Sequence, residues 1–339
     1  MGIQLAGVGH YLPETIRSSA DIERELGRGE GKVFRSTGIR ERRAAGPNET
    51  SWVMGTHAAQ AALAHAGLQP SDIDLLVAHI SQPELDYPDI AWPLARDLGL
   101  SPSCAVMGVR FGCTGFVGSL HVARQFLETG AAKCALVVCA EVMHWHAQSY
   151  PRSAPILGDA AGAAIFRPGR PDEGRGVIAS FVGNLASHIG ECLVVNDHLD
   201  RSAWPQLSPG MAEELGDAPY SPRGTMSFWN GGDIFKRAIE HMTAAVQRVL
   251  EETGLGIDDI DHFLFHQANI RIIKGVARHL DLPLDKAPVH IETVGNTASA
   301  SIPVLLSQEL HAGRIQAGQR LVFVGFGTGY SFGAAVMEL

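Results

Sequence analysis

Hydrophobic positions along the chain follow two periods, one typical of helices and one typical of buried strands. Residues 61–79 read AALAHAGLQPSDIDLLVAH, which predicts a helix that stops at a glycine, a turn, and a continuous apolar strand. Residues 248–266 read RVLEETGLGIDDIDHFLFH and repeat this order. Strands that alternate with helices in this way predict an α/β fold with helices packed on mixed sheets.

The two segments are spaced as copies of one unit. Gly67 matches Gly254 and His79 matches His266, and each pair is 187 residues apart (254 − 67 and 266 − 79). A second echo closes each half, GDAAGAAI in the first and GYSFGAAV in the second, each after a helix and a strand. Two matched features in the same order predict a duplicated α/β unit.

The two copies are expected to join in a segment rich in Pro, Gly and Arg near residues 168–176. This division gives an N-terminal half, residues 1–172, and a C-terminal half, residues 173–339. The stretch 196–225 is rich in Pro, Gly and Asp and predicts an irregular insertion. Insertions of this kind often cover a substrate entrance.

Composition narrows the class of protein. The 339 residues are 45% hydrophobic and carry a formal net charge of −9, which predicts a large core and disfavours nucleic-acid binding. No apolar run reaches the length of a membrane span, and the N-terminus reads as a first strand rather than a signal peptide. Five cysteines without a C-x-x-C pair favour a reduced, cytoplasmic compartment. Cys134 and Cys139 lie in an apolar run and are interpreted as buried hydrophobic residues.

Cys113 lies between two glycines in VRFGCTGFVGSLHVARQFL, residues 109–127. Apolar positions at helical spacing predict that a helix begins near residue 114. The unpaired N–H groups and positive dipole end of a helix favour an anion, so a thiolate here would be nucleophilic at neutral pH. The alternative is a small core residue at a tight turn, and this stretch alone leaves both open.

Three motifs of the second half carry further chemistry. HQANIRII places His266 at the end of a buried strand, where α/β proteins put reactive groups, although a hydrogen-bonded core histidine is the alternative. VGNTASASIP places Asn296 in a turn before a helix, where capping is the alternative. FVGFGTGYSFG, residues 323–333, can aim backbone N–H groups at an oxyanion or simply form a tight hairpin.

Together these motifs resemble the β-ketoacyl-acyl-carrier-protein synthase III family. The resemblance runs essentially end to end and includes STGIRER at 36–42, PNET at 47–50 and GDAAGAA at 158–164. It implies a thiolase-like α/β fold with duplicated αβαβα layered halves. The two-copy repeat, found from the sequence itself, agrees with that fold.

The resemblance also implies a mechanism. Cys113 would take an acyl group from a thioester, and His266 and Asn296 would hold the carbonyl of a malonyl-type thioester and stabilise the enolate left by loss of CO2. The N–H groups of Cys113 and Thr328 would form the oxyanion hole. An asparagine amide can donate to an enolate oxygen but cannot act as a base, so Asn296 favours condensation over simple acyl transfer.

Substrate-binding residues follow from the same resemblance. Tyr87 would line the acyl pocket across a homodimer interface. Arg152 and Asn269 would contact the phosphate and pantetheine of coenzyme A, and Arg271 and Lys274 would form a docking patch for an acidic acyl carrier protein. For the cations, a solvated surface face is an equal alternative. Acyl-CoA or acyl-carrier-protein thioesters are substrates here, and no resident cofactor is expected.

Two departures from the family pattern stand out. Lys32 and Ser36 take the places of a tryptophan and an arginine that stack on the adenine of coenzyme A, so the acyl donor is held differently or is a carrier protein. Arg110 precedes the nucleophile where family members have small residues. A buried arginine needs a partner, and pairing with Glu141 or Asp159 is preferred here to a carboxylate on the substrate.

Three functions of different kinds therefore remain. The leading hypothesis is a decarboxylating condensing enzyme of fatty-acid or specialised, polyketide-type biosynthesis. The second is an acyltransferase that moves the acyl group from Cys113 to a hydroxyl or amine without decarboxylation. The third is a non-catalytic partner subunit, which is disfavoured because such partners typically lose the nucleophile. HWH at 144–146 lacks a third ligand nearby, so no metal is expected.

Overall fold

The computed structural model describes most of the chain, namely residues 2–85, 87–144, 155–169, 176–195, 225–228 and 231–339. The expected boundary between the halves at 172/173, Arg152 and nearly all of the insertion at 196–225 lie outside the described residues. The side chains of residues 190–195 and 225–228 are likewise not described.

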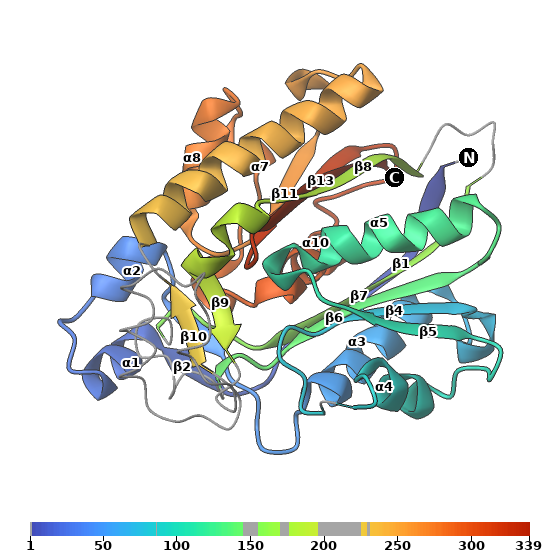
Figure 1. Cartoon of the computed structure of the whole chain (residues 1–339), viewed down its shortest axis with the longest axis horizontal. Helices are drawn as coiled ribbons and strands as arrows, with labels where there is room; N and C mark the ends of the chain where they lie inside the picture. Colours follow the sequence, from blue (N-terminus) through green and yellow to red (C-terminus); the bar gives the residue numbers. More distant parts are fainter. Residues whose placement is uncertain (1, 86, 145–154, 170–175, 196–224, 229–230) are drawn as a thin grey trace.

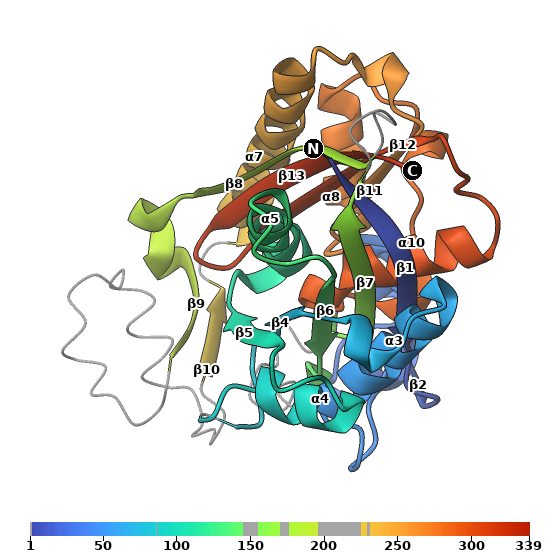
Figure 2. The same ribbon diagram turned by 90° about the vertical axis from the view of Figure 1, so that its right-hand side faces the viewer.

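The described strands form one large mixed sheet in the order β11-β12-β13-β8-β1-β7-β6-β4-β5. The strands of the first half are β1 Ile3–Tyr11, β4 Leu75–His79, β5 Ala105–Val109, β6 Ala135–Glu141 and β7 Ala160–Pro168. Those of the second half are β8 Gly176–Asn184, β11 His262–Phe265, β12 Arg320–Gly327 and β13 Ser331–Glu338. Two short ribbons complete the strands, β2 Ile16–Ser18 with β3 Glu41–Arg43, and β9 Cys192–Val195 with β10 Thr225–Phe228, the latter apart from the main sheet (Figure 2).

The pairing pattern is the same in both halves. In the first, β4 runs parallel to β6, and β6–β7 and β7–β1 are antiparallel. In the second, β11 runs parallel to β12, and β12–β13 and β13–β8 are antiparallel. The halves meet where Ile3 of β1 pairs with Val177 of β8. The duplication expected from the 187-residue spacing is therefore confirmed in the order and direction of the strands.

Helices pack on this sheet in layers (Figure 1). Helices α3 and α4 cover the outer face of the first half, α7 and α8 cover that of the second, and α5 and α10 lie between the two halves. The helix bounds are α1 Ser19–Glu25, α2 Lys32–Thr37, α3 Ser51–Ala66, α4 Ala91–Leu98, α5 Gly115–Glu128, α7 Gly231–Thr253, α8 Ile270–His279, α9 Ile291–Val294 and α10 Ser301–His311. This arrangement is the αβαβα layering of the thiolase-like fold.

Capping residues mark where helices begin and end. The Thr50 side chain accepts the Val53 N–H to cap α3, and Gly67 ends it in the left-handed conformation, as Gly254 does after α7. In the core between the halves, α5 packs against β12. The ring centroids of Phe116 and Phe323 lie 5.5 Å apart in an edge-to-face arrangement. The two central helices are thereby held at the joint of the halves, where the site lies.

Among the described helices, none combines the length and the apolar composition needed to cross a lipid bilayer.

Candidate active site

A cavity of about 490 Å³ lies at the joint of the two halves and has walls from both. Cys113 of the first half lines it together with His266, Asn296 and Thr328 of the second. The structure thus brings into one cavity the four residues that the sequence assigns to catalysis. The rest of the lining is mostly apolar and includes Met143, Ile156, Leu157, Ile234, Phe235, Ala238, Met242, Ile272, Phe326 and Tyr330. This size and composition are typical of a small-molecule site.

Cys113 lies in the short 3₁₀ turn η2, Gly112–Thr114, directly before α5. Gly112 has φ +56°, and a Cβ atom built on it would lie 3.1 Å from the Thr328 amide nitrogen. The turn after β12 therefore packs against the turn that holds the thiol. Two backbone amides, those of Cys113 and Thr328, are close neighbours at the place where the sequence predicts an oxyanion hole.

Burial separates Cys113 from the other described cysteines. Cys104, Cys134 and Cys139 are buried, whereas Cys113 is partly exposed and lines the cavity. Burial raises the pKa of Cys104 to about 11 and that of Cys139 well above its ordinary value. Since the thiolate is the nucleophilic form, the buried cysteines are inert packing residues, as expected for Cys134 and Cys139.

His266 directly follows β11 and is buried. Its backbone N–H donates to the Val324 carbonyl, and its Nδ1 atom lies 2.8 Å from the Ser301 hydroxyl. Burial lowers the pKa of His266 to about 4, against the smaller opposing effect of a hydrogen bond to the Ala298 carbonyl. The imidazole is therefore neutral at pH 7, and a neutral imidazole can still donate one N–H hydrogen bond.

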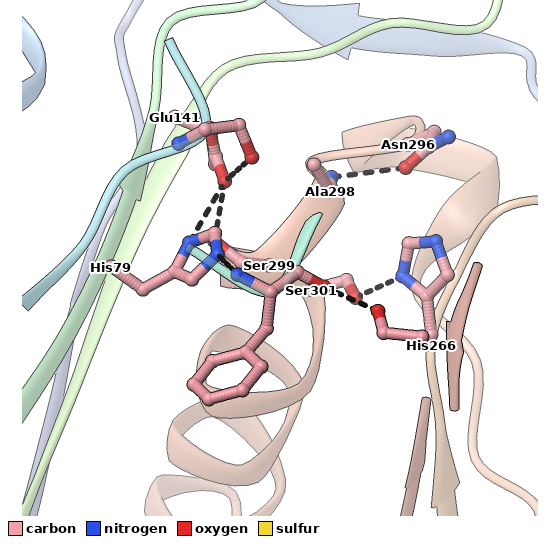
Figure 3. A network of polar contacts seen from close by, with 10 residues as sticks. His79, Glu141, His266, Asn296, Ala298, Ser299 and Ser301 are labelled. Carbon is pink, nitrogen blue, oxygen red and sulfur yellow. Dashed lines mark hydrogen bonds and ion pairs between the residues drawn. The ribbon is translucent and has the colours of Figure 1, made fainter. Parts of the chain in front are cut away.

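Asn296 occupies the turn between α9 and η8, the 3₁₀ turn Ala298–Ala300. Its backbone N–H donates to the Ile156 carbonyl, and its Oδ1 atom accepts the Ala298 N–H at 2.9 Å. The carboxamide oxygen thus caps the turn, and the amide NH2 forms no hydrogen bond with the described part of the chain; Figure 3 shows the carboxamide near the His266 ring. Capping and a place in the cavity, alternatives in the sequence, both hold for this residue.

The Cys113 turn is held from both halves. The Phe111 N–H donates to His79 Nε2 of β4 at 2.8 Å, and the Phe111 carbonyl accepts the Ser331 hydroxyl of β13 at 2.6 Å. The Thr114 hydroxyl also lies 2.8 Å from the Ser331 hydroxyl. Sequence reasoning missed the role of His79, although its match to His266 in the repeat was the available signal.

Arg110 is placed differently from the expectation. It is exposed and lines the cavity instead of being buried in an ion pair. Glu141 accepts a hydrogen bond from the Ser299 hydroxyl, and Asp159 accepts one from the Met143 N–H. The predicted structural pair with Glu141 or Asp159 is wrong, because these carboxylates bond other groups and β5 leaves Arg110 at the sheet edge.

Three of the predicted binding residues lie around the start of α8. Asn269 lines the cavity, caps α8 by accepting the Arg271 N–H, and donates to the Ser36 carbonyl. The Arg271 guanidinium donates to the Arg35 carbonyl at 2.9 Å, so α2 and α8 are joined at the cavity rim. Lys274 is exposed one turn further along α8.

Tyr87 is 92% exposed in the single chain and stands outside the cavity walls that the described residues form. It therefore contributes to no acyl pocket within one copy.

Glycine at position 327 is required by its close contact with Cys113. A Cβ atom at this position would lie 2.4 Å from the Cys113 amide nitrogen, which is backbone and cannot move aside cheaply. We expect Gly327→Ala to lower the rate of acyl transfer to Cys113 by about 100-fold, as for a misplaced nucleophile. Gly256→Ala, at an exposed turn with nothing closer than 3.5 Å to the new Cβ, is the matched control. Equal rates for the two variants would contradict this packing.

Two buried histidines predict acid sensitivity. Burial lowers the pKa of His266 and of His290 from 6.5 to about 4. Between these pKa values the unfolded chain binds protons that the folded chain does not, so the free energy of unfolding falls as pH falls from 6.5 toward 4. Urea unfolding at about pH 7.5 and about pH 5 measures this loss, which we expect to be smaller in His290→Gln and unchanged in a variant of the exposed His279. If the free energy of unfolding falls as much in His290→Gln as in wild type when the pH is lowered, His290 does not contribute to the acid sensitivity.

Comparisons with known proteins agree with this geometry. Residues 250–339 match the family described as 3-oxoacyl-[acyl-carrier-protein] synthase III C terminal, and residues 107–185 match 3-oxoacyl-[acyl-carrier-protein] synthase III. The β-ketoacyl-[acyl-carrier-protein] synthase III of Symbiobacterium thermophilum is 34% identical over 337 residues, 99% of this chain and 98% of the relative. That of Clostridium acetobutylicum is also 34% identical, with the same coverage.

Solved structures extend the comparison to three dimensions. The 3-oxoacyl-[acyl-carrier-protein] synthase III of Aquifex aeolicus matches over 100% of both chains with a TM-score of 0.87 and 27% identity. The priming β-ketosynthase of the R1128 polyketide biosynthetic pathway matches over 99% of this chain and 96% of its own, with a TM-score of 0.85 and 28% identity. By its similarity to relatives over nearly its whole length, the chain belongs to the β-ketoacyl-[acyl-carrier-protein] synthase III family and is a condensing transferase of that type.

Proposed function

We propose that the protein transfers an acyl group from a thioester to Cys113 and condenses it with a malonyl-type thioester, with loss of CO2. The observation that carries this proposal is that Cys113, His266 and Asn296 line one largely apolar cavity. Asn296 is the residue that favours condensation, because its amide donates a hydrogen bond but accepts no proton.

In the first half-reaction, the Cys113 thiolate attacks the thioester carbonyl. The N–H groups of Cys113 and Thr328 stabilise the oxyanion of the tetrahedral intermediate, and the thiolate of the acyl donor leaves. The closeness of the two turns at Gly112 and Gly327 supports this role.

In the second half-reaction, the carbonyl of the malonyl-type thioester accepts hydrogen bonds from His266 and Asn296. In the proposed step His266 takes the tautomer with its proton on Nε2, in which Nδ1 accepts the Ser301 hydroxyl 2.8 Å away and the Nε2–H donates. Cleavage of the bond to the carboxylate releases CO2 and leaves an enolate whose oxygen both side chains stabilise. Its carbon then attacks the acyl-Cys113 carbonyl, the C–S bond breaks, and a β-ketoacyl thioester and the Cys113 thiolate are formed.

The acyl carrier protein and a second copy of the chain are the proposed macromolecular partners. Arg271 and the exposed Lys274, beside Asn269 at the cavity rim, are placed for contact with an acidic carrier protein. The names of the curated relatives include this carrier. The exposed Tyr87 is proposed to complete the acyl pocket of a partner copy, and β5 is one of the two edge strands of the described sheet.

The test separates the two half-reactions. Intact mass spectrometry after mixing with acyl-CoA or acyl-carrier-protein thioesters detects the acyl adduct and identifies the donor. Release of labelled CO2 from malonyl-carrier protein, dependent on that adduct, supports condensation. An adduct that turns over with an amine or hydroxyl and without a malonyl thioester would instead establish the non-decarboxylating acyltransferase.

A further inference from the structure

A buried polar network lies behind the Cys113 turn. His79 at the end of β4 is 0% exposed and Glu141 at the end of β6 is 1% exposed. His79 Nε2 accepts the Phe111 N–H at 2.8 Å. Its Nδ1 atom has no hydrogen-bond partner among the described residues and lies at ion-pair distance, 3.6 Å, from Glu141 Oε1. Neither side chain lines the cavity as the described residues define it, so neither contacts substrate directly.

The hydrogen bond to Phe111 fixes the state of the imidazole. A ring nitrogen that accepts a backbone N–H carries no proton, so the proton of a neutral His79 is on Nδ1, facing Glu141. The negative charge of the carboxylate favours this tautomer. The ring also packs beneath the start of α5, since a Cβ atom on Gly115 would lie 2.5 Å from His79 Cγ.

Glu141 extends the network into the second half. Its Oε1 atom accepts the Ser299 hydroxyl at 2.5 Å and the Ser81 hydroxyl at 2.7 Å. Ser299 lies in η8, next to Ala298, whose N–H donates to the Asn296 carboxamide. One carboxylate is thus connected through His79 to the nucleophile turn and through Ser299 to the Asn296 turn (Figure 3).

We propose that His79 and Glu141 are positioning residues, which hold the Cys113 turn and the Asn296 turn in register across the joint of the two halves. His79 is the counterpart of His266 in the repeat and lies at the equivalent strand end. It contacts the backbone beside Cys113, whereas His266 is proposed to bind the malonyl-type thioester. The kinetic consequences rest on the proposed function, whereas the structural consequence at the Phe111 amide does not.

The first experiment compares two amides at position 79. The carbonyl of Gln reaches the place of Nε2 and can accept the Phe111 N–H, whereas the shorter Asn occupies the place of Nδ1 and cannot. We expect His79→Asn to lower the rate of Cys113 acylation by about 30-fold and His79→Gln to stay within about 5-fold of wild type, since misplacement of a nucleophile has effects of this order. Because both variants are polar and of similar size, rescue by Gln separates positioning from general destabilisation.

Two readouts at position 79 do not depend on the proposed function. Hydrogen exchange at the Phe111 amide should accelerate in His79→Asn and remain slow in His79→Gln. The rate of Cys113 alkylation by iodoacetamide should likewise change in His79→Asn and stay close to wild type in His79→Gln. It is measured on tryptic peptide 111–124, which contains no other cysteine. If wild type forms no acyl adduct but these readouts behave as stated, the proposed function fails and the positioning role stands.

The second experiment removes the bridge to the Asn296 turn. We expect Ser299→Ala to lower CO2 release by about 10-fold while acylation of Cys113 changes by less than about 3-fold, as for loss of one hydrogen bond. Ser307→Ala removes another buried hydroxyl, which bonds His10 outside the site, and is the matched control. Equal hydrogen exchange at the Phe111 amide in both His79 variants would overturn the proposal, as would equal CO2 release in the two serine variants when wild type itself releases CO2.

Discussion

Replacing Cys113 by alanine is expected to abolish acylation and to lower the rate of condensation by at least about 10⁴-fold, as removal of a catalytic nucleophile does in other enzymes. The reason is that Cys113 is the one described cysteine that lines the cavity, while burial makes Cys104, Cys134 and Cys139 inert. Intact mass spectrometry with an acyl thioester measures the adduct, and product formation with malonyl-carrier protein measures the overall rate.

The control for this variant is Cys134→Ala, which removes a buried thiol outside the cavity and should leave acylation unchanged. Cys113→Ala adds no atoms and keeps the backbone contact between Cys113 and Gly327, so its melting temperature should stay close to wild type. An adduct of normal yield in Cys113→Ala would show that the acyl group is carried elsewhere.

The fold was predictable to an unusual depth because the chain carries its own internal comparison. Gly67 and Gly254 end helices in the left-handed conformation at equivalent places, and the strands that follow them occupy equivalent positions in the sheet. Because both copies must pack in the same way, the same hydrophobic pattern occurs twice in the sequence, and each copy supports the prediction made from the other. The order of strands within the sheet, by contrast, depends on pairing between distant segments and was not predicted from the sequence.

The candidate site was predictable where residues carry chemistry in local motifs. Cys113, His266 and Asn296 each lie at a turn or strand end whose motif is visible in sequence, and all three line the cavity. Arg110 was predicted wrongly because burial beside a nucleophile was assumed from sequence distance, whereas the residue lies at an exposed sheet edge. Sequence spacing gives no distance between side chains on different elements.

The His79–Glu141–Ser299 network could not be predicted from the sequence either. His79 and Glu141 come from different strands and meet Ser299 from the second half. Ser299 lies in the motif that carries Asn296, but His79 and Glu141 belong to no motif that indicates a reaction, and each of the three would pass for a buried polar residue. Only their contacts with Phe111 and with the Asn296 turn relate them to the site. Residues that act by holding others are recognised from geometry.

Asn296→Asp should separate the two half-reactions most sharply. The carboxylate can still accept the Ala298 N–H that caps the turn, but it loses the amide donor and places negative charge beside the enolate oxygen. We expect CO2 release to fall by at least about 10³-fold, since a single oxyanion donor contributes about 10²–10³ and repulsion adds to its loss. Acylation of Cys113 should remain within about 3-fold of wild type, because Asn296 has no part in that step.

His266→Gln is the companion variant, since it removes the imidazole but keeps a side chain that can donate. We expect an intermediate loss of CO2 release, about 10²-fold, with acylation preserved. The pKa of His266, lowered to about 4, adds a pH test. Protonation of His266 should not change the wild-type rate of CO2 release until pH falls toward 4, where the imidazole gains a charge. Normal CO2 release in Asn296→Asp, with an intact Cys113 adduct, would remove the carboxamide from the reaction, because decarboxylation would then proceed without its donor.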